Sequence, residues 1–209
     1  MPKVKEPTVA YRQNISYQTF RPSTIRKEER LFTYDDFLSF PNPNEGTRYE
    51  IINGELFMSP APKPLHQDIV GNLFFLIKSH VTKHELGKVY FSPIDIVLSF
   101  TTIVEPDLIF ISNERKHIIV EKNIIEAPDF VVEVLSPSNK KYDEVQKKNL
   151  YQQFGVKEYW IVDAEKQTIS QFILEGKMYS SANIFSLNEK ISSSVIKGLR
   201  INVKKIFSF

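Results

Sequence analysis

The sequence of 209 residues contains no cysteine, which excludes disulfide bonds and thiolate chemistry. No apolar run reaches the ~18 residues that a membrane-spanning helix needs, and the amino-terminal residues lack the apolar segment of a signal peptide. Only seven glycines are present, widely scattered, and they form no glycine-rich phosphate loop. A GxSxG nucleophile elbow is also absent. We therefore expect a cytoplasmic protein outside the nucleotide-binding folds.

Apolar and aromatic residues, in contrast, are plentiful. The sequence is 42% hydrophobic and 12% aromatic, which is enough to bury the core of one ordinary domain. Its net charge of +2 permits a nucleic-acid partner without requiring one. Residues 1–30 carry seven basic and three acidic residues and few periodic apolar positions. We interpret them as a basic arm, either solvated or in contact with phosphates or another subunit, and residues 31–209 as the domain.

Local signals predict alternating helices and strands in this domain. Thr33 begins a short helix, and Asn53-Gly54 marks a hairpin between alternating apolar residues. Apolar residues recur every three or four positions over 64–86, which predicts a long helix with Gly87 as its C-terminal cap. Trp160, in the strand "KEYWIVD", is expected to pack a second helix, at about 140–154, against the sheet. The order of elements predicts a mixed α/β (α+β) fold, a sheet with a helix on each side.

Two apolar strands contain carboxylates, and they carry most of the functional information. Asp107 opens the strand in "EPDLIFIS", and Glu133 interrupts the one in "PDFVVEVLSPS". A carboxylate in a buried strand is costly unless a charge pairs with it. Strands this close in sequence can lie antiparallel with both carboxylates at one level, where a divalent cation such as Mg²⁺ would hold them. The alternative is two strand-end carboxylates that face solvent.

A wider set of strings resembles a known family. "YEIINGEL", "MSPAP", "PDL", "VVEVLSPSN" and "EYWIVD" are together similar to the Uma-type "putative restriction endonuclease" family of the PD-(D/E)XK nuclease superfamily. The resemblance covers roughly residues 31–185. It implies a restriction-endonuclease-like mixed β-sheet flanked by helices, and a phosphodiesterase core that depends on Mg²⁺ or Mn²⁺.

The sequence departs from the simplest form of that motif at one position. The residue two after Glu133 would be lysine, but it is Leu135. The family string offers a replacement on the following helix, where Asp143, Lys147 and Tyr151 recur at steps of four and share one row. The resemblance implies Lys147 as the displaced lysine, with Lys148 second. A surface Asp143–Lys147 ion pair is the alternative.

Two upstream residues are further candidates. Glu50 and Glu55 flank the hairpin turn, and the family string favours Glu55 as an added metal ligand. Alternation places Glu55 on the face of Phe57, toward the interior. His66 near the start of the long helix also matches the string, as a phosphate or ligand contact or, alternatively, as a capping or packing residue.

We therefore expect a Mg²⁺-dependent endonuclease that hydrolyses DNA. In this hypothesis Asp107, Glu133 and the backbone carbonyl of Val134 hold the metal, and Lys147 positions the attacking water. The competing hypothesis is a non-catalytic nucleic-acid-binding or interaction module on the same fold. Since cleavage of both DNA strands calls for two active sites, we also expect a homodimer, formed through the arm or a hairpin at 168–180.

Overall fold

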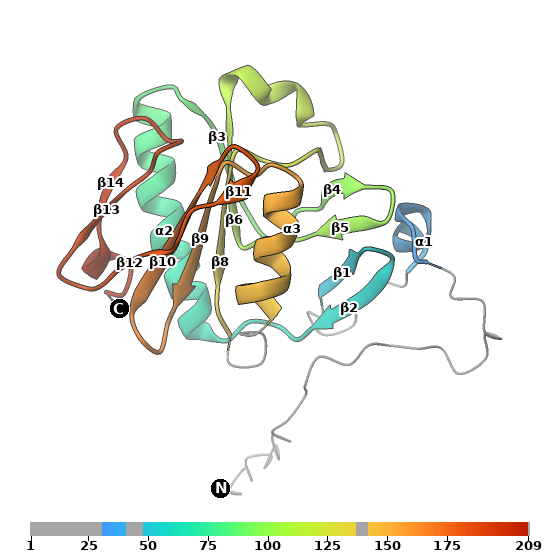
Figure 1. The fold of residues 1–209 in the computed structure, drawn as a ribbon, viewed down its shortest axis with the longest axis horizontal. Coiled ribbons are helices and arrows are strands. Elements are labelled where there is room, and N and C mark those ends of the chain that lie inside the picture. The colour runs from blue at the N-terminus through green and yellow to red at the C-terminus, as the bar shows by residue number, and fades with distance from the viewer. Residues whose placement is uncertain (1–30, 41–47, 137–141, 209) are drawn as a thin grey trace, which may run out of the picture.

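The computed structural model describes residues 31–40, 48–136 and 142–208, so the predicted basic arm at 1–30 lies outside the described residues. The described chain forms a mixed α/β architecture, as predicted (Figure 1). In chain order its elements are α1 (Tyr34–Ser39), β1 (Arg48–Ile52), β2 (Glu55–Ser59), α2 (Pro64–Lys83), β3 (Gly87–Phe91), β4 (Ile96–Ser99), β5 (Thr102–Val104), β6 (Leu108–Ser112), a 3-10 helix (Asn113–Ile118), β7 (Ile124–Ile125), β8 (Phe130–Val134), a π-helical turn (Tyr142–Lys147), α3 (Lys148–Gln153), β9 (Glu158–Asp163), β10 (Thr168–Glu175), β11 (Met178–Tyr179), β12 (Asn183–Phe185), β13 (Lys190–Ser192), β14 (Arg200–Asn202) and a final 3-10 helix (Val203–Lys205).

A seven-stranded sheet forms the centre of the domain. Its order is β11-β10-β9-β8-β6-β3, with β12 also paired to β10. Strand β8 lies in the middle and is buried along its whole length, which confirms its assignment as a central strand. It runs antiparallel to β6 and parallel to β9. The π-helical turn and α3 make the crossover that a parallel pair requires.

Helices α2 and α3 cover opposite faces of this sheet (Figure 1). The apolar row of α2 packs on one face, with Val132 and Trp160 in the same core. The other face contacts α3, where Tyr151 and Tyr159 pack edge to face with ring centroids 5.1 Å apart. The expectation that Trp160 packs against the second helix was therefore wrong. Because side chains alternate along β9, Tyr159 faces α3 and Trp160 faces α2.

A second, five-stranded sheet, ordered β2-β1-β5-β4-β7, packs beside α3. Its β1–β2 hairpin turns at Asn53 and Gly54, both with positive φ (52° and 81°), as a type I′ turn requires. Thr33 caps α1 with the predicted capping box, in which its side chain accepts from the Asp36 amide. Local sequence signals thus placed both elements correctly.

The end of α2 differs from the prediction. The helix stops at Lys83, and Glu85 rather than a glycine adopts the left-handed conformation, at φ 52°. Gly87 is not the cap but the first residue of β3. A Cβ atom there would lie 2.1 Å from the carbonyl oxygen of Ile111. The glycine is needed for close strand packing, which helix periodicity cannot indicate.

We expect Gly87→Ala to lower the free energy of unfolding by about 1–3 kcal/mol, the usual cost of overpacking. Gly71→Ala is the matched control, because no atom lies within 4 Å of the Cβ it would add. At this exposed site in α2 alanine should raise stability by up to about 1 kcal/mol. Urea unfolding of both variants measures the difference, and a neutral Gly87→Ala would contradict the packing argument.

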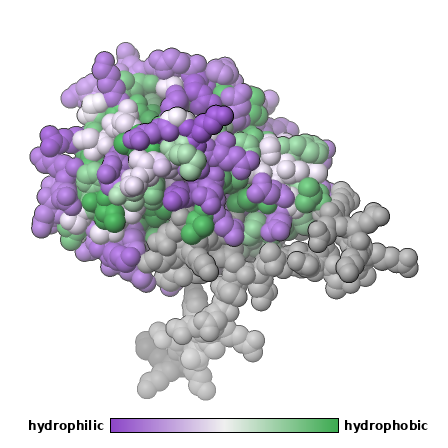
Figure 2. All heavy atoms as spheres, viewed as in Figure 1, coloured by the Kyte–Doolittle hydropathy of each residue, from purple (hydrophilic) through white to green (hydrophobic). Residues whose placement is uncertain are grey.

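No helix in residues 31–40, 48–136 and 142–208 is long and apolar enough to cross a membrane. The face in Figure 2 is largely hydrophilic, with hydrophobic residues in small, separate areas. That face marks no obvious interface, and the homodimer stays a prediction.

Candidate active site

Asp107 and Glu133 meet because β6 and β8 are antiparallel neighbours. The register pairs Leu108 with Val132, and one step further along it Asp107 lies opposite Glu133. Directly opposed residues of antiparallel strands project from the same face of the sheet. Both side chains are buried, with 2% and 4% of their residue surfaces exposed. The alternative of two solvent-facing strand-end carboxylates is therefore wrong.

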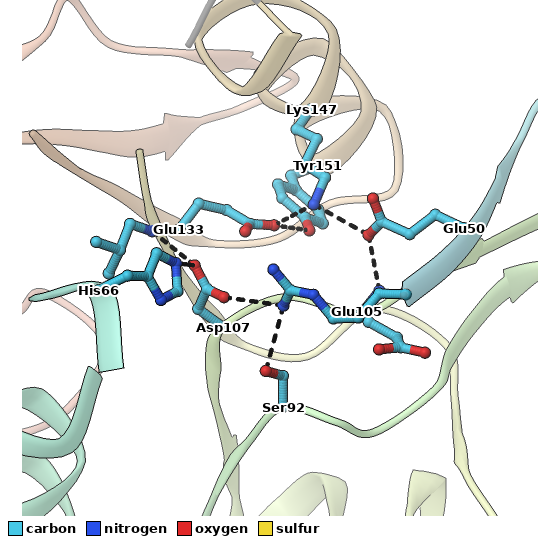
Figure 3. Close-up of polar contacts among 10 residues, drawn as sticks. Glu50, His66, Ser92, Glu105, Asp107, Glu133, Lys147 and Tyr151 are labelled. Carbon is cyan, nitrogen blue, oxygen red and sulfur yellow. Dashed lines mark hydrogen bonds and ion pairs between the residues drawn. The ribbon is translucent and has the colours of Figure 1, made fainter. Parts of the chain in front are cut away.

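Three groups hold the carboxylate of Asp107 (Figure 3). The Val134 amide donates to its Oδ2 at 2.8 Å, and His66 Nε2 lies 3.0 Å from the same oxygen. Arg48 Nη1 donates to Oδ1 at 3.1 Å. Burial alone would raise the pKa of Asp107, but His66, Arg48 and the Val134 amide together lower it to about 2. Asp107 is thus ionised at neutral pH.

Glu133 lies in a different environment, formed by the helix that follows its strand. Lys147 Nζ donates to its Oε1 at 2.8 Å, and the Tyr151 hydroxyl donates to the same oxygen at 2.7 Å (Figure 3). Burial raises the pKa of Glu133 to about 7, and the carboxylates of Asp107 and Glu50 add to this while Lys147 opposes it. Neighbouring carboxylates with pKa values pushed this far apart are typical of acid–base and metal sites.

Lys147 reaches the site from the helix, as the spacing of the family string implied. Its side chain is buried, and it projects with Tyr151 from one row toward β8. Lys148, the second choice, is turned away, with its amine 5.0 Å from the centroid of Phe172. The side chain of Asp143 lies outside the described residues.

The upstream carboxylate at the site is Glu50, not Glu55. Glu50 is buried, and its Oε1 lies 3.0 Å from Lys147 Nζ, whereas Glu55 is exposed. The hairpin register pairs Ile52 with Glu55 and Glu50 with Phe57, so both carboxylates share the inner face. Glu55 is nevertheless exposed, at the turn end of β2. Glu55 as a metal ligand therefore stays a prediction, whereas Glu50 is the upstream carboxylate that contacts Lys147.

Arg48 also belongs to the site, although it was not among the candidates predicted from the sequence. It stands two residues before Glu50 on β1, and both project from the same face. Its Nη1 contacts Ser92 Oγ at 3.3 Å as well as Asp107. Burial alone would lower the pKa of Arg48, but Asp107 and Glu50 raise it above its ordinary value. The alternation of Arg48 and Glu50 within an apolar strand was the available sequence signal.

A second missed residue is Glu105, whose backbone amide donates to Glu50 Oε1 at 2.8 Å. Burial raises its pKa to about 7, and the carboxylates of Asp95 and Glu50 contribute. Its Oε2 is buried and has no hydrogen-bond partner within the described chain. Glu105 thus adds another carboxylate to an already crowded site.

The composition of the site suits a divalent cation, although no cage is preformed. Three buried carboxylates face two cations, Arg48 and Lys147, and the raised pKa of Glu133 reflects burial and this surplus of negative charge. No group of three or more His, Cys, Asp or Glu side chains among the described residues is arranged to hold a metal. Mg²⁺ needs fewer protein ligands, since it usually binds one or two carboxylates and keeps several waters. The residues that carry the site are Arg48, Glu50, His66, Asp107, Glu133, Lys147 and Tyr151.

Comparison with known proteins identifies a family and a similar fold. The sequence model of the Uma2 family, described as "Putative restriction endonuclease", matches residues 34–204. A solved structure from Anabaena variabilis ATCC 29413, described as a putative nuclease belonging to DUF820, is similar in fold with a TM-score of 0.71. It is 20% identical in sequence, over 84% of this chain and 97% of that one. No curated protein matches the chain.

Proposed function

Because the chain belongs to the Uma2 family, we propose that it is a metal-dependent endonuclease that hydrolyses DNA phosphodiester bonds. One observation carries the proposal: the buried amine of Lys147 reaches Glu133, opposite Asp107, although Leu135 occupies the usual lysine position. The catalytic lysine is thereby moved from the strand to the neighbouring helix, while the charge stays beside the carboxylates.

Asp107, Glu133 and the backbone carbonyl of Val134 would hold Mg²⁺ or Mn²⁺. When bound, such an ion lowers the pKa of a coordinated water and stabilises negative charge on the phosphate. The 2.8 Å bond from the Val134 amide and the contact with His66 fix the orientation of Asp107. His66 therefore acts as a positioning residue for Asp107.

Lys147 supplies the fixed positive charge of the reaction. Its amine, held between Glu133 and Glu50 at 2.8 and 3.0 Å, is placed to orient the attacking water and to neutralise charge that develops at the phosphate. The Tyr151 hydroxyl donates to Glu133 and keeps that carboxylate turned toward the amine. Since the pKa of Glu133 is about 7, this residue can also accept a proton near neutral pH.

DNA is the substrate that the family description favours, because restriction endonucleases cut DNA. A pocket of about 210 Å³ beside the site is lined by Lys63, His66, Leu135 and Asp163, among others. It lies at the start of α2 and beyond the carboxyl ends of the parallel strands β8 and β9, where α/β sheets commonly bind ligands. This pocket gives part of the substrate a place next to His66, which contacts Asp107.

The test measures cleavage and stability together. The full chain should cut plasmid DNA with Mg²⁺ or Mn²⁺ and not with EDTA, and either ion should raise its melting temperature, since a ligand of the native state stabilises it. Asp107→Asn should abolish both effects, with Asp68→Asn, on the exposed side of α2, as the matched control. Absence of cleavage and of any metal effect in the unaltered protein would favour the non-catalytic binding module instead.

A further inference from the structure

Arg48 contacts the Asp107 oxygen that neither the Val134 amide nor His66 contacts. Both the Val134 amide and His66 contact Oδ2, at 2.8 and 3.0 Å. The contact to Oδ1 comes from Arg48 Nη1 at 3.1 Å (Figure 3). A divalent cation bound at Oδ1 would be displaced from, or repelled by, a guanidinium in this position.

The contacts of Arg48 are incomplete, and its side chain is not locked in. Its Nε is buried without a hydrogen-bond partner in the described part of the chain, which is a costly arrangement for a charged group. One fifth of the side chain remains exposed, compared with 5% for Lys147. Arg48 is the first residue of strand β1 and lies at the end of the paired segment of the hairpin. An alternative position with its donors in water or on phosphate is therefore accessible.

We propose that Arg48 is an internal counter-cation that competes with the divalent metal for Oδ1 of Asp107, so that metal binding is coupled to release of its guanidinium. The inference rests on the metal site of the proposed function and adds a residue that tunes its affinity. Without metal, Arg48 offsets part of the charge of Asp107 and Glu50. With metal, the ion takes over that role and the guanidinium is released to the surface, where a phosphate could bind it.

The sign of the expected effect separates competition from a structural role. If Arg48 only supported the fold of the site, its removal would loosen Asp107 and weaken metal binding. Asp107 keeps two contacts without Arg48, from the Val134 amide and His66, so its orientation should survive. If Arg48 occupies Oδ1 in about nine of ten molecules, only about one tenth of the protein can bind metal, and the apparent affinity for metal is about tenfold weaker. Removal of the competitor should therefore tighten metal binding by that factor.

Titration calorimetry of the full chain with Mn²⁺ tests this inference. Arg48→Met and Arg48→Gln, both neutral, should bind Mn²⁺ at least about tenfold more tightly than the unaltered protein. Arg48→Lys, which keeps the charge, should stay within about threefold of it. Arg200→Met removes a positive charge from the exposed position of that residue in β14 and should change the affinity less than twofold. Circular dichroism verifies that each variant is folded, and either neutral variant suffices.

The possible results distinguish this inference from the proposed function. Mn²⁺ binding that is lost in Asp107→Asn supports the metal site whatever Arg48 does. If the unaltered protein binds Mn²⁺ and both neutral variants bind it equally or more weakly, competition by Arg48 is refuted while the metal site stands. If neither the unaltered protein nor any Arg48 variant binds Mn²⁺, the metal site and the inference both fall.

Discussion

Replacement of Lys147 by methionine should lower the rate of metal-dependent DNA cleavage by about 10²–10³-fold, the usual cost of losing one electrostatic contact to the transition state. The reason is the position of the Lys147 amine beside the carboxylates. The amine lies 2.8 Å from Glu133 and 3.0 Å from Glu50, in a buried setting where no solvent cation can replace it. Methionine keeps the apolar stem and most of the length of the side chain, and it removes the charge and the hydrogen bonds of the amine. Single-turnover cleavage of a labelled duplex measures the loss.

Lys148→Met is the matched control, since it removes the same charge from the adjacent residue. The Lys148 amine lies over Phe172, away from Glu133, so its loss should change cleavage less than about twofold. Lys147→Met also leaves buried carboxylates without their cation, which can cost about 3–5 kcal/mol of stability. Rates must therefore be compared well below the melting temperature. Equal cleavage by the two variants would remove Lys147 from the mechanism.

Local chemistry was enough to predict most of the elements. The capping box at Thr33 and the turn at Asn53-Gly54 depend on residues only a few positions apart, and both formed as expected. The end of α2 was predicted wrongly because Gly87 meets Ile111, which is distant in sequence. The partner of Trp160 depended on which residues of β9 face which helix, and burial on both faces removes that signal.

At the site, too, contacts between residues close in sequence could be predicted and contacts between distant residues could not. Asp107 and Glu133 could be placed together from the sequence because the strands that carry them are consecutive and antiparallel, apart from the very short β7. Arg48 and Glu50 enter from another sheet, whose strand β1 pairs with β5 at Ile51 and Ile103. That pairing joins residues far apart in the chain, and no turn signal or periodicity in the sequence predicts it. A cation beside Asp107 was thus predictable in kind, but its identity as Arg48 was not.

Glu158 carries the same sequence signal as Glu133, a carboxylate in a buried strand, yet its surroundings differ. It is fully buried, and its Oε1 accepts hydrogen bonds from Trp160 Nε1 at 2.6 Å and Gln171 Nε2 at 2.7 Å. Its Oε2 accepts from the amide and hydroxyl of Ser194, both at 2.8 Å, and from Ser193 Oγ at 2.8 Å and the Val195 amide at 3.1 Å. All of these donors are neutral. Their hydrogen bonds join β9 and β10 to residues 193–195, between β13 and β14.

Glu158→Gln should therefore lower the free energy of unfolding by about 2–4 kcal/mol, because the amide nitrogen cannot accept and leaves two or more buried donors unpaired. Glu165→Gln, at an exposed position just after β9, is the matched control and should change stability by less than about 0.5 kcal/mol. Urea unfolding measures both, and hydrogen exchange should locate the loss at residues 193–202. A neutral Glu158→Gln would show that these hydrogen bonds contribute little.

In contrast to Glu158→Gln, the substitution Glu133→Gln should not lower the free energy of unfolding. Burial and the nearby carboxylates raise the pKa of Glu133 to about 7, so folding penalises its ionised form, and glutamine removes that penalty. Near pH 8, where most unfolded chains carry an ionised Glu133, the substitution should leave stability unchanged or raise it, while metal-dependent cleavage is lost. A stability loss as large as that of Glu158→Gln would mean that Glu133 is a structural residue. Glu133 thus differs from Glu158 in the repulsion from neighbouring carboxylates that surrounds it, a difference that the two strand sequences do not reveal.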